Sequence, residues 1–590
     1  MNQNSYISKI LKIILPFGKK RFGWVVILSI VQGVLQALSI FSILPFLAFV
    51  TSPETIKNSN GFKEIEPYLP AFIEENLILS AGLILITLIL LSNTVNLLSD
   101  YYRQKYSTHT ALLIGTDLLT VYAYQPYAFH LSNNSGELIK RIQSDVNRFL
   151  AGGILPFIVI ISTLINLFFI LILLILVNWK VIVVSCMFFS VLVWISNVLF
   201  AQKMTKGSRE RKEMESKRYQ TGFQLLTGIK SATIHNAQQY FLKRFKKQWS
   251  VIANHDTFLA VASNGPRYVI EAVAFAGIVL LVLYLNNQNT SLQTVIPTLA
   301  LFVMAAYRIL PNFQVVNAQL NLMKSYSYTV DIITEDFIEK DKIKKNESDA
   351  VSGLKKELPF NHKIIVKGLY FRYSGASVDS LKNLNLEIVK GQRVGIIGAS
   401  GAGKSTFVDI ILGLLKPTKG FVQVDAQSLD NTNISTWRQK IGYVPQEIFL
   451  IDDTVIRNIA FGINSEDIDF SKIIKAAKLA QIDDFITTMS EGYDTICGDR
   501  GVKLSGGQRQ RIVLARALYH EPEVLIFDEA TSALDNETEK RLLESIESLP
   551  RDLTILQIAH RMETIKSCDL VFNFINGKLD SIISPKDMTN

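Results

Sequence analysis

The sequence predicts a helical membrane domain followed by a soluble α/β domain that carries a phosphate-binding loop. Three observations support this fold class: an excess of apolar residues confined to the first half, six long apolar runs within it, and the sequence GASGAGKS at residues 398–405. The whole chain is only 19% charged, whereas an average soluble domain is about 25% charged. The change in composition predicts a membrane domain over 1–325, a linker over 326–362 and a soluble domain over 363–590.

The apolar runs have the length and composition of membrane-spanning helices, which need about 20 apolar residues to cross a bilayer. The first is too long for a signal peptide and is followed by five more. Asn178, Trp179 and Lys180 supply the only turn between the third and fourth runs. The six predicted spans are 25–50, 77–99, 151–179, 181–202, 272–285 and 295–307.

Charge predicts the orientation of these spans. The loop 53–76 is acidic and should face outward, whereas segments 103–148 and 203–267 are rich in Lys and Arg and should face the cytoplasm. We therefore expect a multi-pass protein of the cell inner (cytoplasmic) membrane with its soluble domain in the cytoplasm. Much of the net charge of +9 lies in one predicted cytoplasmic segment, so no nucleic-acid partner is expected. Apolar residues at helical spacing near Tyr6 predict an interfacial helix.

The glycine-rich loop lies between a predicted strand, 393–397, and a predicted helix, 406–415. Glycines allow backbone amides to curl around phosphate, Lys404 supplies a point charge to the terminal phosphates, and the Ser405 hydroxyl can ligate Mg²⁺. ATP and Mg²⁺ are the ligands that this pattern predicts. The predicted nucleotide contacts are Gly398, Ala399, Ser400, Gly401, Ala402, Gly403, Lys404, Ser405 and Thr406.

A second strand, 524–529, is apolar and ends in two carboxylates. Asp528 is placed to hold Mg²⁺, and Glu529 can orient or activate an attacking water. Three other polar residues follow or precede apolar strands: Tyr373, Gln446 and His560. Each of these three, taken alone, is more often a structural residue than a ligand.

Together these residues resemble the nucleotide-binding domain of ATP-binding-cassette (ABC) transporters, because LSGGQ at 504–508 and SALD at 532–535 complete the family's motif order. The resemblance implies that Tyr373 stacks on adenine, that Gln446 serves both catalysis and Mg²⁺, and that Glu529 and His560 are catalytic. It also implies a head-to-tail dimer, in which the signature of one copy closes over ATP bound by the other. The signature contacts implied are Ser505, Gly506, Gly507 and Gln508.

Six spans ahead of one such domain match the half-transporter layout of ABC exporters. The expected fold is therefore a six-helix ABC exporter transmembrane domain plus an α/β P-loop ABC ATPase domain. A homodimer with two complete sites is expected, and a heterodimer remains open. The expected function is ATP-driven export or flipping of an amphipathic substrate by alternating access.

The prediction of the transported substrate depends on two basic residues. Arg267 in PRYVIEAVAF and Arg308 in AAYRILP resemble cavity arginines of bacterial lipid-linked oligosaccharide flippases, although the second span, 77–99, lacks the arginine of that group. A lipid-linked oligosaccharide or related membrane lipid is the first hypothesis, and a peptide or multidrug exporter is the second. Interface snorkelling is the alternative reading of Arg267. An ATP-gated channel or regulator without pumping is disfavoured, because every catalytic residue type is present.

Overall fold

The computed structural model describes residues 3–51, 76–287, 292–337, 357–529, 544–559 and 565–584. Two compact units emerge from the chain. Unit 1 comprises Met1–Tyr124 and Asn133–Ile343, and unit 2 comprises Gln125–Ser132 and Lys344–Asn590. Each unit is considered by itself.

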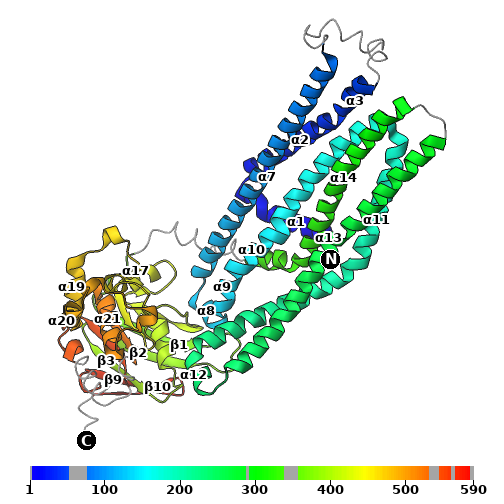
Figure 1. Ribbon diagram of the computed structural model, residues 1–590. Coiled ribbons are helices and arrows are strands. Elements are labelled where there is room, and N and C mark those ends of the chain that lie inside the picture. Colours follow the sequence, from blue (N-terminus) through cyan, green and yellow to red (C-terminus); the bar gives the residue numbers. More distant parts are fainter. Residues whose placement is uncertain are drawn as a thin grey trace. The chain divides into compact units, whose positions relative to one another are not determined.

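The described part of unit 1 is helical, and its long helices run in broadly similar directions (Figure 1). Two π-helical turns, Arg141–Asp145 and Leu150–Ile154, keep the chain helical between short segments. The elements are α1 (Gln3–Ile14), η1 (Leu15–Phe17), α2 (Lys19–Phe41), α3 (Ile43–Thr51), α7 (Leu77–Ala123), α9 (Ser135–Lys140), α10 (Val146–Phe149), α11 (Leu155–Thr227), α12 (Ile229–Ile234), α13 (Gln238–Asn287) and α14 (Leu292–Ser325).

Three helices among the described residues are long and apolar enough to cross a membrane: Lys19–Val50, Leu77–Ala123 and Ser135–Leu173. They contain all or most of the first three predicted spans. The other three predicted runs have helical backbone in α11, α13 and α14, but most of their side chains lie outside the described residues. The predicted acidic loop lies outside them as well, apart from its last residue.

The turn predicted at 178–180 is not a break in secondary structure, because α11 is helical throughout. Neither glycine nor proline occurs among these three residues, so nothing in the local sequence interrupts helical hydrogen bonding. Figure 1 shows that the path of α11 instead reverses between its cyan beginning and its green end.

Small and polar side chains join the helices of unit 1. Gln36 Nε2 on α2 donates to Asn96 Oδ1 on α7 at 2.9 Å, and the Ser29 hydroxyl on α2 lies 2.7 Å from that of Ser162 on α11. A Cβ added at Gly33 would lie only 2.8 Å from the Phe169 ring, so glycine permits the close approach of α2 and α11. Such contacts hold membrane helices together where lipid removes the hydrophobic driving force.

Much of the polar segments that follow the predicted spans is helical and continues the long helices α7, α11 and α13. Glu215 on α11 is 1% exposed and pairs with Arg148 of α10, while Arg211 Nε contacts Asp256 Oδ1 of α13 at 2.8 Å. Residues 327–337, at the start of the predicted linker, are also helical, belong to unit 1, and include the fully buried Val330. Ordered helix therefore continues beyond the change in composition at residue 325.

Unit 2 is an α/β domain with two sheets. The first is antiparallel, with strand order β2-β1-β4-β5; the second has the order β10-β9-β3-β8-β7-β6 and is parallel apart from the edge strand β10. The strands are β1 (Lys363–Phe371), β2 (Leu381–Val389), β3 (Arg393–Gly398), β4 (Lys419–Val424), β5 (Gln427–Ser428), β6 (Ile441–Val444), β7 (Val524–Asp528), β8 (Thr554–Ile558), β9 (Leu570–Ile575) and β10 (Lys578–Ile583). The principal helices are α8 (Tyr127–Ser132), α16 (Lys404–Ile411), α17 (Ile434–Gln439), α18 (Val455–Ile459), α19 (Phe470–Leu479), α20 (Asp483–Thr488) and α21 (Gly506–Tyr519).

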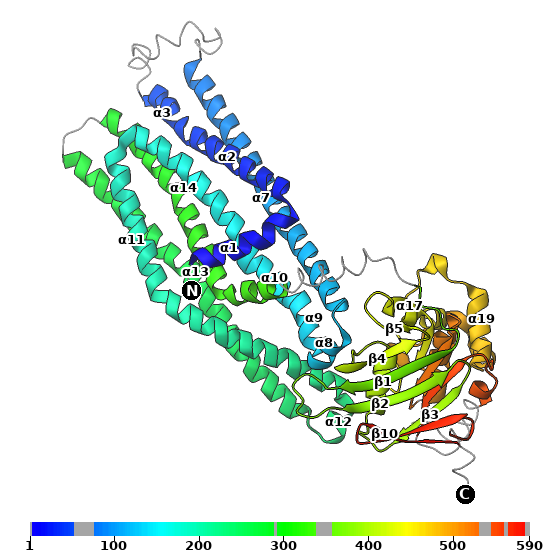
Figure 2. The ribbon, with the colours of Figure 1, turned by 180° about the vertical axis from the view of Figure 1, so that it is seen from behind.

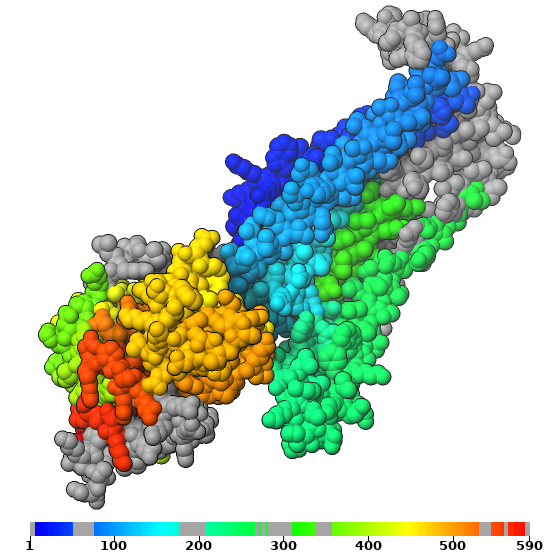
Figure 3. Space-filling model, turned by 60° about the vertical axis from the view of Figure 1, so that its left-hand side comes forward, coloured from blue at the N-terminus to red at the C-terminus, as the bar shows by residue number. Residues whose placement is uncertain are grey.

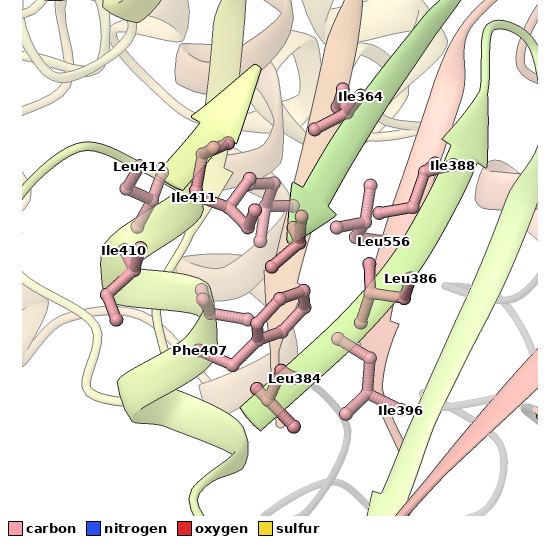
Figure 4. Packing of buried hydrophobic residues seen from close by; sticks show 14 of the residues in the cluster. Ile364, Leu384, Leu386, Ile388, Ile396, Phe407, Ile410, Ile411, Leu412 and Leu556 are labelled. Atoms are coloured by element: carbon pink, nitrogen blue, oxygen red, sulfur yellow. The ribbon is translucent and has the colours of Figure 1, made fainter. Parts of the chain in front are cut away.

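The core of unit 2 fixes α16 against both sheets. Figure 4 shows Phe407 of α16 next to Leu384 of β2, and Ile411 of α16 and Ile396 of β3 belong to the same buried cluster. Every residue of β7 and β8 is buried, as expected for central parallel strands covered on both faces. Because β3 and β7 lie in the same parallel sheet, the loops after their carboxyl ends meet at one edge, where α/β proteins bind ligands.

Candidate nucleotide-binding site

The loop between β3 and α16 has a backbone that only glycine accommodates at its two ends. Gly398 has φ +146°, and a Cβ there would lie 2.3 Å from the Phe574 carbonyl oxygen. Gly403 has φ +99°, and a Cβ there would lie 2.9 Å from the Ser380 carbonyl oxygen. Gly401, at φ +79°, has open space on its Cβ side. The tight ends and open centre form a backbone cradle of the kind that binds phosphate.

Lys404 and the start of α16 provide the positive character of this cradle. Lys404 is 5% exposed, and its Nζ donates to the carbonyl oxygens of Gly398 at 2.8 Å and Ala399 at 3.2 Å. The first amides of a helix have no intrahelical acceptor, so those of α16 can donate to an anion. The predicted contacts 398–406 thus form one continuous loop and helix start.

Asp528 ends the buried strand β7, close to Ser405. Tyr443 Oη donates to Asp528 Oδ2 at 3.4 Å, and among the described residues the buried Oδ1 has no hydrogen-bond partner. The pKa of Asp528 is raised above its ordinary value. Burial and then the Glu529 carboxylate raise it, and they outweigh Tyr443, Ser405 and Lys404, which lower it. Mg²⁺ prefers oxygen ligands. A buried carboxylate oxygen that accepts no hydrogen bond, together with a nearby hydroxyl, is a pair of ligands that fits Mg²⁺.

Glu529 and Gln446, which lie 83 residues apart in the sequence, meet at the edge of the sheet. Gln446 Nε2 donates to Glu529 Oε2 at 2.7 Å. Glu529 has φ +50°, a left-handed conformation that costs a non-glycine residue roughly 1–3 kcal/mol. Strained backbone of this kind is concentrated at functional sites. His560 and the motif at 532–535 lie outside the described residues.

Tyr373 lies beside the start of α16. Its hydroxyl is 3.0 Å from the Thr406 hydroxyl, and its ring packs edge to face on Phe371 with centroids 4.9 Å apart. The side chain is half-buried, so part of the ring is accessible to a planar ligand.

The LSGGQ sequence forms the amino terminus of α21 through a capping box. Ser505 Oγ accepts from the Gln508 amide at 3.3 Å, and the Ser505 amide donates to Gln508 Oε1 at 2.8 Å. A Cβ at Gly506 would meet nothing within 4 Å. Ser505 and Gln508 thus satisfy the helix end locally, and Gly506 leaves the backbone open for an anionic group to approach.

Three residues near the site were missed by the sequence reasoning: Asp409, Tyr443 and Tyr127. Asp409 follows Ser405 by four residues, so both lie on one face of α16, and this spacing could have indicated it. Tyr443 belongs to β6, the neighbour of β7. Tyr127 belongs to α8, and electrostatic interactions link it to Asp409, Tyr373 and Asp528. No sequence pattern points to Tyr127, because its segment is far from the rest of unit 2 in the chain.

Asp409 makes the stability of the nucleotide-free protein depend on pH. Burial, with a contribution from Asp528, raises the pKa of Asp409 to about 6. A raised carboxyl pKa means that the folded state loses stability as pH rises from about 4 to about 6. After a discount for partial exposure, we expect Asp409→Asn to stabilise unit 2 by about 1 kcal/mol at pH 7.5.

The measurement is thermal unfolding in EDTA without nucleotide, at pH 5 and pH 7.5. The gain should be clearly smaller at pH 5, because wild-type Asp409 is then mostly protonated. Asp494→Asn, at an exposed position, should change little at either pH. An equal gain for Asp409→Asn at both values would contradict the role assigned to its charge.

Comparisons with known proteins cover both units. The family described as "ABC transporter transmembrane region" matches residues 22–307, and the family described as "ABC transporter" matches residues 381–532. The chain is 46% identical to ABC transporter B family member 22 of Arabidopsis thaliana over 198 residues, 34% of this chain and 16% of the length of that relative.

Other relatives match most of the chain. The ATP-dependent lipid A-core flippase of Cupriavidus metallidurans is 27% identical over 491 residues, 82% of this chain and 80% of the relative. The heterocyst differentiation ATP-binding protein HepA of a Nostoc species is 28% identical and covers 95% of this chain and 91% of its own. A structure of a bacterial Atm1-family ABC exporter with ATP bound is similar with a TM-score of 0.73 at 22% identity, and covers 96% of both chains. This likeness confirms the predicted fold class.

Proposed function

Because this chain belongs to the ABC transporter family, as an exporter-type half-transporter that couples ATP hydrolysis to transport, we propose that it flips or exports a lipid-linked oligosaccharide or a related membrane lipid. The observation that carries this proposal is the extent of the match to the lipid A-core flippase. Its 491 matched residues exceed the whole nucleotide-binding half, so the similarity includes the membrane half. The 198-residue match to the Arabidopsis relative carries no information about cargo, because it is too short to include both halves.

Two arginines would recognise the cargo in this proposal. The backbone of Arg267 lies in α13 and that of Arg308 in α14, while their side chains lie outside the described residues. Guanidinium binds phosphate through two parallel hydrogen bonds, which suits the phosphate groups of a lipid-linked glycan. The cost of placing arginine at membrane depth favours a position that faces water or an anionic partner.

ATP hydrolysis would use the site at the edge of the second sheet. Glu529 would accept a hydrogen bond from the attacking water and receive its proton as the oxygen attacks the terminal phosphorus, with ADP leaving. Gln446 holds the Glu529 carboxylate by the 2.7 Å hydrogen bond. Asp528, Ser405 and Gln446 would hold Mg²⁺, which would neutralise phosphate charge when bound. His560 would contact the terminal phosphate from the loop after β8.

The complete transporter would be a homodimer in the cell inner (cytoplasmic) membrane. One chain supplies one phosphate loop and one LSGGQ helix, and the signature of each copy would close over ATP bound by the other. Binding of ATP can change the orientation of the membrane half only because the closed state binds ATP more tightly than the open state. Hydrolysis would reset the cycle.

Reconstitution into liposomes tests the cargo. We expect lipid-linked oligosaccharide to stimulate ATPase activity several-fold, whereas plain phospholipid and hydrophobic peptides stimulate it little. Stimulation by peptide alone would reject the lipid proposal in favour of a peptide exporter. Headgroup translocation that proceeds without hydrolysis would indicate an ATP-gated channel instead.

The same assay includes a variant of the cargo contact. Arg308→Ala should remove most of the stimulation by lipid-linked oligosaccharide and leave basal ATPase activity intact. Lys243→Ala, at an exposed position on α13, serves as the control and should behave as wild type. An unchanged response of the Arg308 variant would assign that residue a structural role.

A further inference from the structure

The first part of the chain, before Glu54, is basic without any acidic residue. The basic residues lie on α1 and at the start of α2, where the first span begins. They are Lys9, Lys12, Lys19, Lys20 and Arg21. Only Lys9 of these five has an ion pair among the described residues. Within the described residues, four positive charges thus lie near the start of the first span without an acidic side chain paired to them.

One face of α1 is fixed to the rest of unit 1. Ile10 and Ile14 are fully buried on this face. Lys9 Nζ contacts Asp331 Oδ1 at 2.7 Å, and Tyr6 Oη donates to the Met323 carbonyl oxygen at 3.2 Å. Figure 2 shows α1 crossing the long helices rather than running along them. These protein contacts set the position of α1, so its exposed surface is in place before any ligand binds.

A second apolar stripe runs beside the buried face of α1 and continues into η1. Ile7, Leu11 and Leu15 follow each other at intervals of four residues, and Ile7 is 41% exposed. With Lys12 and Lys19 they line an open surface depression of about 650 Å³. In Figure 3 the dark blue atoms of this segment form part of the surface of unit 1. The stripe runs along the edge of the buried face: Ile7 is exposed and Leu11 and Leu15 are half-buried, so part of its apolar surface is open to a ligand.

The start of α2 places this depression at a membrane surface. The first span begins at Lys19, and Trp24, 63% exposed, lies little more than one turn further along. Tryptophan is enriched where the bilayer meets water, and long basic side chains reach from there toward headgroups. A cytoplasmic leaflet that contains anionic lipid attracts nearby basic residues.

We propose that this depression is a binding site for one anionic phospholipid of the cytoplasmic leaflet. The lipid phosphate lies between Lys12 and Lys19, and an acyl chain follows the stripe formed by Ile7, Leu11 and Leu15. Charge complementarity and continuity with the first span select a lipid, since a free anion would leave the apolar stripe uncovered. This lipid is a resident ligand of the transporter and is independent of the proposed cargo.

Native mass spectrometry of the delipidated full-length protein in detergent tests the site. We titrate phosphatidylglycerol and, separately, neutral phosphatidylcholine. The double variant Lys12→Gln/Lys19→Gln should bind phosphatidylglycerol about tenfold more weakly, with phosphatidylcholine binding unchanged. Lys243→Gln/Lys246→Gln removes the same charge from exposed positions on α13 and should retain wild-type affinity for both lipids.

A second variant distinguishes a lipid from a free anion. Ile7→Ser/Leu11→Ser keeps every charge and should weaken binding of both lipids, and glycerol phosphate should not compete. Phosphatidylglycerol affinity within twofold of wild type in the lysine variant, or an equal loss in its control, would overturn the proposal. Competition by glycerol phosphate together with an unaffected Ile7→Ser/Leu11→Ser variant would also overturn it, because it would indicate a site for small anions.

Discussion

Glu529→Gln is expected to retain ATP binding and to lower the rate of ATP hydrolysis by about a thousandfold, the scale of a lost general base. The amide has the shape of the carboxylate, and its oxygen can still accept from Gln446 Nε2, which lies 2.7 Å from the native carboxylate. The geometry of the site should therefore survive. The capacity to attract a proton from water is lost, because an amide is not basic at neutral pH.

The measurement is ATPase activity of purified protein beside equilibrium binding of a fluorescent ATP analogue. Glu523→Gln is the matched control: the same substitution immediately before β7, where Glu523 is partly exposed and pairs with Lys390 and Lys440. Such pairs contribute little, so turnover should stay within about twofold of wild type. Near-normal ATPase activity in Glu529→Gln would remove Glu529 from catalysis.

The phosphate loop could be predicted from sequence because its determinants are local. Gly398, Gly403 and Lys404 act through backbone angles and spacing within eight residues, and the structure places them on one loop. The apolar strand before Asp528 could be predicted for the same reason, since a fully buried parallel strand reads as a continuous apolar run.

The surroundings of the site could not be predicted because they depend on tertiary structure. Tyr443 reaches Asp528 only because β6 and β7 are neighbours in the sheet, although 85 residues separate the two in sequence. Tyr127 joins unit 2 from a segment that lies between the second and third of the helices long enough to span a membrane. The reversal of the path of α11 fits the turn predicted at 178–180, but its unbroken helical backbone was not predicted, because a short polar interruption between apolar runs resembles a loop.

The cargo is harder to predict than the ATPase for a physical reason. Phosphate recognition needs a particular backbone geometry, and that geometry leaves a fixed spacing of glycines. Recognition of an amphipathic lipid needs only a few polar groups along a membrane cavity, so Arg267 and Arg308 have no obligatory spacing. The cargo proposal therefore depends on the relatives that match both halves of the chain.

In the proposed homodimer each nucleotide site is composite: the phosphate loop comes from one copy and the LSGGQ helix from the other. One substitution in each of these two parts should inactivate the transporter. Lys404→Ala removes the charge that would contact the terminal phosphates in the proposed mechanism. Gly506→Asp places a carboxylate where the helix start of α21 would meet the phosphates of ATP on the partner. The aspartate itself should fold without difficulty, because the position is open and an acidic residue stabilises a helix start. We expect each variant alone to lose at least about a hundredfold in ATPase activity.

The most direct test of the composite site is to combine these two variants in one dimer. Copies with different affinity tags are co-expressed, and the mixed dimers are isolated by sequential purification on both tags. If each signature acts on the other copy, a mixed dimer has one site with both changes and one with neither. We predict that it recovers up to about half the wild-type ATPase rate, as expected for one intact site of two. Mixed dimers no more active than either parent would contradict the assignment of the two motifs to a site shared between two copies.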